Sequence, residues 1–229
     1  MTYEVREKFY QGHYREASDF PIPNTQYTPL YLDGENHSLN LDKPKQTHVS
    51  HYHSEKDNES LRFTYTFSED TELTGNMNLK LWVSSNEADD MDIFVGIKKL
   101  DRQGNEVNFP DFNHIEQGQV ATGWLRVSHR KLDDEKSTII QPWHKHEQEL
   151  KLKKGEIVPI EIEILPSSTY FKQGETLVVV IKGNEIIKGT SSPGLSTRYE
   201  HHETVNKGHH YIHTGANYDS QLIIPIIPQ

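Results

Sequence analysis

Residues 158–183 read VPIEIEILPSSTYFKQGETLVVVIKG and contain two kinds of strand pattern. In the first part, apolar residues at every second position alternate with Glu161 and Glu163, which is the period of a strand with one face on a core. The last eight residues, TLVVVIKG, are almost continuously apolar and predict a central strand covered on both faces. Gln173-Gly174-Glu175 between them is typical of a turn. This stretch therefore predicts two strands of a β-sheet.

The same alternation recurs in RFTYTF (62–67), NMNLKLWV (76–83) and DIFVGIKKL (92–100). Alanine, the strongest helix former, occurs only four times in 229 residues. Many short strands separated by Gly, Pro, Asn and Asp favour an antiparallel, two-sheet sandwich. We therefore predict an all-β fold, with helix limited to a turn or two near residues 12–18 or 135–137. Polar residues 43–58 and 190–208 are predicted to be the least ordered.

Composition excludes several classes of function. The chain has no cysteine, which excludes disulfides, thiol catalysis and thiolate metal sites. A net charge of −10 and the lack of a basic stripe argue against a nucleic-acid partner. The first twenty residues lack the apolar core of a signal peptide, and no apolar run approaches the ~20 residues of a membrane span. These features are typical of a soluble, cytoplasmic protein without a membrane partner.

No catalytic residue is predicted. A serine hydrolase needs its nucleophile on a sharp elbow, usually G-x-S-x-G between a strand and a helix. The nearest string, Gly194-Leu195-Ser196-Thr197-Arg198, lacks the second glycine and follows no clear strand. We therefore expect the chain alone to catalyse no acyl transfer and to need no cofactor.

Exposed aromatic and acidic residues are candidates for ligand binding. A sandwich that displays tryptophans beside carboxylates can stack on sugar rings, and the candidate residues are Trp82, Trp124, Trp143, Asp90 and Asp92. Packing against the core is the alternative for the tryptophans. The acidic runs 68–72 and 87–92 flank one strand and could offer oxygens to calcium, but their spacing matches no EF-hand loop and solvated loop charge is the commoner explanation.

Histidines form the second group of candidates. Two pairs, His51/His53 and His144/His146, are two residues apart, so on a strand each pair lies on one face. Five more crowd residues 201–213. Neutral imidazoles bind zinc, and we consider His209, His210 and His213 as a metal site. The alternative is a set of polar loop residues and hydrogen-bonded structural histidines.

Four longer strings, in this order along the chain, carry a family resemblance: 67–106, 123–133, 141–183 and 206–228. Together they resemble the C-terminal, non-catalytic domain of X-prolyl dipeptidyl-peptidases and cocaine-esterase-type (CocE/NonD) serine hydrolases. The string YREASDFPIPNTQYTPLYLDG (14–34) is similar to the segment that joins the catalytic domain to this one in that family.

The resemblance implies a jelly-roll β-sandwich of the galactose-binding-like type at residues 31–229, preceded by an N-terminal extension or linker at 1–30. It implies packing against an α/β-hydrolase domain, where the sandwich walls or stabilises the active site, and it makes a homo-oligomer a further expected assembly. The family's Ser, Asp and His triad belongs to the catalytic domain, so no catalytic residue carries over. A stand-alone module that binds a carbohydrate or another small ligand is the alternative function.

Two local predictions accompany the matched strings. Gly123 is predicted to let the backbone turn into the strand that carries Trp124. Arg126 or Arg130 is predicted to pair with a carboxylate of Asp89, Asp90 or Asp92, because a two-pronged arginine–carboxylate pair would brace a strand edge.

Overall fold

The computed structural model describes residues 1–110, 118–187 and 203–228. Within these ranges the regular structure is fourteen strands and one short 3-10 helix, which confirms the all-β prediction. None of the described residues forms a helix with the length and apolarity to cross a bilayer. The elements are β1 (Thr2–Lys8), β2 (Gln11–Glu16), β3 (Gln26–Asp33), β4 (Ser38–Asn40), β5 (His48–His53), β6 (Leu61–Thr66), β7 (Thr71–Ser85), β8 (Asp92–Leu100), β9 (Glu106–Val107), β10 (Ala121–Arg126), η1 (Val127–His129), β11 (Val158–Phe171), β12 (Thr176–Lys182), β13 (His209–Thr214) and β14 (Gln221–Ile227).

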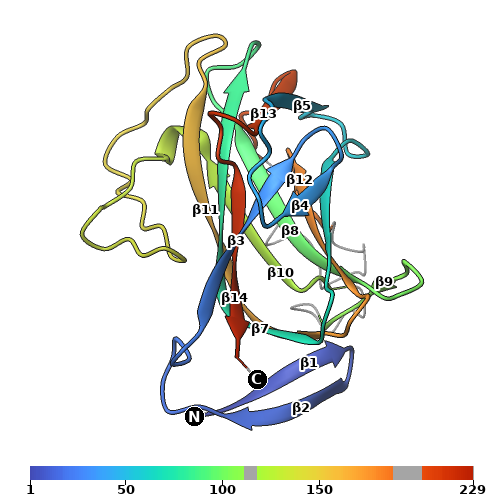
Figure 1. Cartoon of the computed structure of the whole chain (residues 1–229). Helices are drawn as coiled ribbons and strands as arrows, with labels where there is room; N and C mark the ends of the chain where they lie inside the picture. Colours follow the sequence, from blue (N-terminus) through green and yellow to red (C-terminus); the bar gives the residue numbers. More distant parts are fainter. Residues whose placement is uncertain (111–117, 188–202, 229) are drawn as a thin grey trace, which may run out of the picture.

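The strands form one curled sheet in the order β10-β8-β12-β6-β4-β3-β14-β7-β11-β1-β2, with β13, β5 and β9 attached beside this path (Figure 1). The curl brings β10 against β11 and encloses the core. At this contact a Cβ on Gly123 would lie 2.2 Å from the carbonyl oxygen of Glu163. The sandwich prediction is consistent with this curled sheet, whereas the jelly-roll, galactose-binding-like topology stays a prediction.

Gly123 therefore has a different role from the predicted one. It lies inside β10, opposite Val95 of β8, and is not a turn residue. Its missing side chain lets two backbones approach, and this close approach lets the sheet curl.

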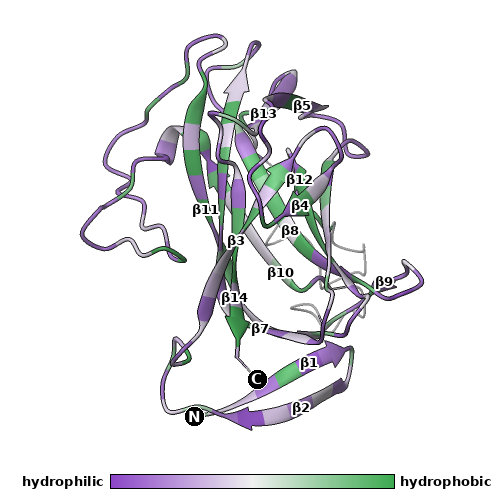
Figure 2. Cartoon of the chain, in the orientation of Figure 1, coloured by the Kyte–Doolittle hydropathy of each residue, from purple (hydrophilic) through white to green (hydrophobic). Residues whose placement is uncertain are grey.

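The two longest strands, β7 and β11, pair along almost their whole length, from Val158 opposite Val83 to Phe171 opposite Thr71. Their alternating apolar residues are buried, as predicted. β12 lies between β6 and β8, and its residues from Leu177 to Lys182 are all buried, which confirms the predicted central strand. Figure 2 shows the apolar residues concentrated on these central strands and the polar residues on the loops and on the β1–β2 hairpin.

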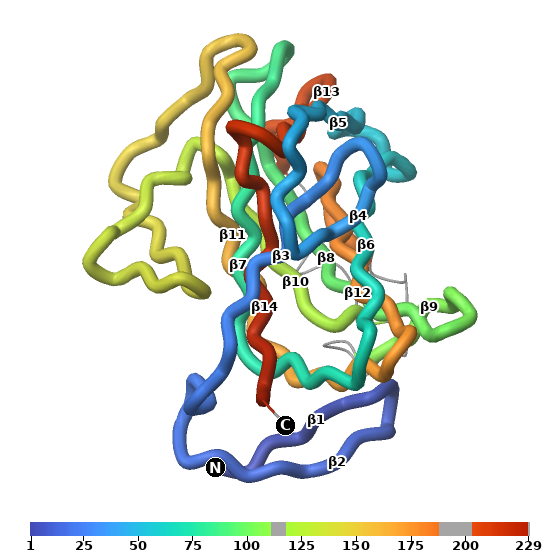
Figure 3. Tube along the Cα trace, viewed as in Figure 1, coloured from blue at the N-terminus to red at the C-terminus, as the bar shows by residue number. Residues whose placement is uncertain are grey.

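The prediction of a helical turn at residues 12–18 is wrong, because Gln11–Glu16 is strand β2 and pairs with β1. That pairing satisfies the backbone groups that a helical turn would have bonded internally. Residues 133–137 form one hydrogen-bonded turn, in which the Ser137 amide donates to the Asp133 carbonyl at 2.9 Å. The described helical turn is η1 instead, at the start of the long connection between β10 and β11 that projects to one side in Figure 3.

The N-terminal hairpin is fixed to the rest of the sheet by two buried charges. The Glu72 carboxylate accepts hydrogen bonds from Tyr3 and Arg15, and the Lys99 ammonium donates to the Glu7 carbonyl at 3.0 Å. Strand β3 begins at Gln26, so the predicted boundary at residue 30 lies within it. The division into 1–30 and 31–229 itself stays a prediction.

Candidate ligand-binding pocket

A pocket of about 430 Å³ lies on the outer face of β8 and β10. In this antiparallel pair Trp124 is opposite Phe94, and Arg126 is opposite Asp92. Side chains alternate along a strand, so Gly123 and its alternate neighbours face the core while Trp124 and Arg126 face outward. Trp124 is 49% exposed and is an aromatic residue of the pocket lining. The lining residues are Asp92, Ile93, Phe94, Trp124, Leu125, Arg126, His129, His144, His146 and Glu203.

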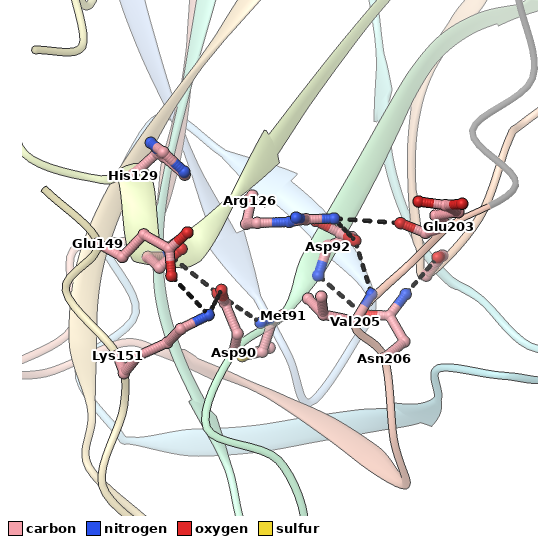
Figure 4. Close-up of polar contacts among 12 residues, drawn as sticks. Asp90, Met91, Asp92, Arg126, His129, Glu149, Lys151, Glu203, Val205 and Asn206 are labelled. Atoms are coloured by element: carbon pink, nitrogen blue, oxygen red, sulfur yellow. Dashed lines mark hydrogen bonds and ion pairs between the residues drawn. The ribbon is translucent and has the colours of Figure 1, made fainter. Parts of the chain in front are cut away.

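Asp92 holds one side of the pocket (Figure 4). Its carboxylate accepts two hydrogen bonds from the Arg126 guanidinium, at 2.8 and 3.0 Å, and one from the Val205 amide at 2.9 Å. The Asp92 amide donates to the side-chain oxygen of Asn206 at 2.8 Å. The hydrogen bonds with Asp92 raise the pKa of Arg126 above its ordinary value. The predicted arginine–aspartate pair is thus confirmed for Arg126 and Asp92, and it joins β8, β10 and residues 205–206.

Asp90, two residues before Asp92, makes a separate set of polar contacts outside the pocket lining (Figure 4). Its side chain is 1% exposed and accepts hydrogen bonds from Lys151 Nζ at 3.0 Å and from the amides of Met91 and Ser128 at 2.9 and 2.8 Å. Burial alone would raise the pKa of Asp90, but the hydrogen bonds from Ser128, Lys151 and Met91 outweigh it and lower the pKa. Arg130 donates instead to the carbonyls of Val127 and Leu150. Asp90 is thus a buried support of η1 and the segment around residue 151.

Three histidines of the β10–β11 connection form a wall of the pocket. The Nδ1 atoms of His129 and His146 lie 3.1 Å apart, and their ring centroids are 5.1 Å apart. The centroid of His144 is 5.9 Å from that of His146, and its Nε2 bonds the Glu161 carbonyl at 3.0 Å. Burial lowers the pKa of His144, which favours the neutral ring.

The structure separates the five predicted ligand-binding residues. Trp124 and Asp92 both line the pocket, while Asp90 supports the wall from behind. Trp82 is half-buried and donates from its indole nitrogen to Asp219 at 2.8 Å, so it is engaged elsewhere. Trp143 is 57% exposed and has the Lys136 ammonium 5.7 Å from its ring centroid. Of the five predicted ligand-binding residues, Trp124 and Asp92 line the pocket.

The predicted metal ligands His209, His210 and His213 do not converge. Neighbouring residues of β13 point to opposite faces, so His209 is half-buried beside the rings of His51 and His53 while His210 is fully buried. His210 Nδ1 bonds the Tyr52 hydroxyl at 3.0 Å, and burial lowers its pKa to about 3. Across residues 1–110, 118–187 and 203–228, no group of three or more His, Asp or Glu side chains could hold a metal ion.

One serine contacts an imidazole inside the protein. Ser84 Oγ lies 2.9 Å from His213 Nε2, but the two residues are only 5% and 7% exposed, so a substrate has no access to them. Burial lowers the pKa of His213, as expected for a structural hydrogen bond in the core. Ser196, the serine considered in the sequence, lies outside the described residues.

The sequence patterns did not predict that His129 lines the pocket, or that it lies next to the pair His144/His146. His129 has no neighbouring histidine at strand or helix spacing, and the contact with His146 spans 17 residues. His129 lies next to His146 because of the path of residues 127–157, the connection between β10 and β11, and local sequence spacing does not reveal that path. The pair His144/His146 was visible as a spacing, but only the fold shows that it meets His129.

Comparison with known proteins agrees with the fold. Residues 1–223 match the family described as X-Pro dipeptidyl-peptidase C-terminal non-catalytic domain. A CocE/NonD family hydrolase from Staphylococcus aureus has 68% identical sequence and a TM-score of 0.96, over 99% of this chain and 41% of its own. An aminopeptidase from a Thaumarchaeota archaeon has the same fold at 13% identity and a TM-score of 0.64, over 98% of this chain and 40% of its own.

A curated relative, cocaine esterase from Rhodococcus, is 22% identical over 257 residues, which cover 93% of this chain and 40% of the esterase. The chain thus spans about two fifths of the length of these relatives. Because the family match covers nearly the whole sequence, the chain belongs to the family of X-Pro dipeptidyl-peptidase C-terminal non-catalytic domains, the type of domain found in CocE/NonD hydrolases.

Proposed function

We propose that this chain is the accessory domain of a CocE/NonD-type serine hydrolase and that it walls or stabilises the active site of an α/β-hydrolase domain. The observation that carries the proposal is the coverage of the Staphylococcus aureus hydrolase. Almost all of this chain matches 41% of that enzyme at 68% identity, so the remainder of the relative has no counterpart here.

The pocket supports a role as a wall. Asp92 lines the pocket and binds Arg126 and the Val205 amide, while Asp90 lies outside the lining and binds the amide of Ser128, next to His129. Charge-assisted hydrogen bonds of this kind fix geometry more firmly than neutral ones. A surface held in this way suits a domain that must keep its shape while another domain carries out the chemistry.

An assay of the purified chain tests the non-catalytic part of the proposal. The chain is mixed with p-nitrophenyl esters and with Xaa-Pro-nitroanilides, and in parallel with a fluorophosphonate probe that labels activated serines. We expect no turnover above buffer and no labelling. Turnover that the fluorophosphonate abolishes would refute the proposal, and the Ser84→Ala variant would then show whether the contact with His213 is responsible.

A second function, binding of a carbohydrate or another small ligand, is favoured by one specific observation. The half-exposed indole of Trp124 lies in the pocket beside the Arg126–Asp92 pair, and an indole face with adjacent polar groups suits a sugar ring. Saturable binding on a glycan array that is lost in Trp124→Ala and kept in Trp143→Ala would support it. Binding that is lost equally in both variants would indicate non-specific adsorption.

A further inference from the structure

We propose that the outer face of the β1–β2 hairpin is the surface by which this chain docks on the catalytic domain of its hydrolase. This inference rests on the proposed accessory function and names the surface that performs it. The hairpin face consists of Glu4, Tyr14 and Glu16 on the two strands, together with Tyr10 in the turn between them, and all four residues are exposed.

Strand alternation gives the hairpin two different faces. Tyr3 and Arg15 lie opposite each other on the inner face, where both bond the Glu72 carboxylate. Glu4 and Tyr14 form the next pair along the hairpin, so their side chains point the other way. The outer face is therefore turned away from the sheet that the inner face contacts, and it is open to a partner.

Two tyrosines give the hairpin face a large aromatic area. Tyr10 is 85% exposed and Tyr14 is 75% exposed, and these fractions are the largest among the exposed large apolar side chains of the described residues. Tyr10 also has a φ of 52°, a left-handed conformation that costs a bulky residue free energy. Tyrosine is enriched at protein interfaces, because its ring buries apolar area while its hydroxyl bonds the partner. These are side chains of the kind that an interface buries.

The hairpin adds little to the core of its own domain. Within residues 2–16, all of which the structure describes, Val5 is the one buried apolar side chain, and it lies outside the main apolar core. β1 pairs with β11 at a single position, Arg6 opposite Thr169. A two-stranded hairpin by itself is only marginally stable in water. Apolar packing therefore does not explain why the hairpin is fixed at this place.

Buried charges hold the hairpin instead. The buried Lys99 ammonium donates to the carbonyls of Glu7 and Tyr170, at 3.0 and 2.7 Å, and lies 2.7 Å from the Glu175 carboxylate. The buried Glu72 holds the other end of the hairpin. Burying charged groups costs free energy that their partners return only in part, so such contacts fix a position more than they add stability. A hairpin held in this way suits a docking element that is already in place before its partner binds.

The catalytic domain is the occupant that the order of domains favours. A C-terminal domain follows the rest of its protein, and more than half of the Staphylococcus aureus relative lies outside the match with this chain. Under the proposed function that part joins before β1, directly beside the hairpin face, and a covalent link gives it a high effective concentration there. Because Glu4 and Glu16 border the tyrosines, the complementary surface is an apolar patch with basic side chains around it.

The test compares the isolated chain with a joined protein, in which this chain replaces the matching part of the Staphylococcus aureus hydrolase. Both are treated with tetranitromethane, which nitrates accessible tyrosines, and mass spectrometry follows each site. We expect Tyr10 and Tyr14 to react at least about fivefold more slowly in the joined protein, because an interface excludes the reagent. Tyr211 of β13, at the opposite end of the molecule in Figure 1, is the control and should react equally in both.

A variant tests the contact of the Tyr14 ring directly. Tyr14→Thr removes the ring and keeps a residue that favours strands. In the joined protein it should speed amide exchange across residues 2–16 severalfold, and in the isolated chain, where the ring is exposed, it should change exchange little. Trp143→Ala, at an exposed aromatic residue of the β10–β11 connection, is the matched control and should change exchange of the hairpin in neither protein.

Three outcomes would overturn the proposal. If Tyr10 and Tyr14 react unchanged in the joined protein while other residues of this chain gain protection in hydrogen exchange, the hairpin face is wrong and the accessory function stands. If no residue of this chain gains protection, both are wrong. If the two tyrosines lose reactivity in the isolated chain as its concentration rises, the occupant is a second copy of this chain. Esterase activity of the joined protein establishes that its catalytic part is folded.

Discussion

At the scale of single residues, Asp90 and Asp92 show how one short string organises the pocket. The sequence indicated that these carboxylates and a nearby arginine belong together, and the structure confirms this for Asp92 and Arg126. It did not indicate that Asp90 is buried, because the partners of Asp90 come from residues 128 and 151, far along the chain. Two neighbouring acidic residues thus look alike in sequence and differ in role.

Asp90 predicts a specific dependence of stability on pH. Its pKa is lowered in the folded protein, so its contribution to stability is present above the unfolded-state pKa of about 3.9 and is lost as the pH falls through the folded-state pKa. We expect Asp90→Asn to lower the free energy of unfolding by about 1–3 kcal/mol at pH 7. The difference from the wild type should shrink toward pH 3.

Urea unfolding at pH 7 and pH 3 measures this difference. Asp89→Asn is the matched control, because Asp89 is the preceding residue and its side chain is exposed. Equal differences for Asp90→Asn at both pH values would contradict the assignment of the carboxylate as an ionised buried support.

We expect Gly123→Ala, which adds only one methyl group, to lower the free energy of unfolding strongly. In Gly123→Ala the new methyl group would lie 2.2 Å from the Glu163 carbonyl oxygen, so β10 and β11 must separate. We expect a loss of about 3 kcal/mol in the free energy of unfolding, the upper end of the range typical of an overpacked core. Thr122→Ala, which loses a hydrogen bond to the Val95 carbonyl, should cost about 1 kcal/mol. Similar losses for the two variants in urea unfolding would show that the close contact is unimportant.

At the scale of elements, the sequence predicted which residues form strands better than it predicted how the strands pack against one another. Alternating and continuous apolar runs identified β7, β8, β11 and β12. Alternation indicates a strand with one buried face, and a continuous apolar run indicates a strand buried on both faces. β2 was missed, since its residues are exposed and lack such a pattern. The curl that brings β10 onto β11 depends on a contact between distant backbones, for which a lone glycine is a weak signal.

The hairpin of β1 and β2 should depend on the buried Glu72. Removing the charge in Glu72→Gln weakens the contacts with Arg15 and Tyr3, so we expect faster amide exchange across residues 2–16 and little change in β7 and β11. Hydrogen exchange followed by mass spectrometry measures this directly. Glu16→Gln, an exposed substitution in the same hairpin, is the control. Equal exchange in the two variants would show that Glu72 does not fix the hairpin.

At the scale of the whole molecule, the candidate pocket illustrates what sequence patterns can and cannot supply. Trp124 and Asp92 were identifiable as ligand-binding candidates because tryptophans displayed beside carboxylates on a sandwich can stack on sugar rings, and the structure places both in one pocket. The histidine wall was not identifiable, since it needs the long 127–157 connection to fold back on β11. The prediction of a domain without its own accessible nucleophile rests on the absence of an elbow motif, and the buried Ser84–His213 contact is compatible with it.

The central claim is that this chain acts by docking on a catalytic domain. The most direct test mixes it with the separately produced remainder of the Staphylococcus aureus CocE/NonD hydrolase, the part that this chain does not cover. The account predicts a stable one-to-one complex in size-exclusion chromatography with light scattering, and esterase activity higher than that of the remainder alone. The two proteins eluting separately, with activity unchanged by this chain, would contradict it.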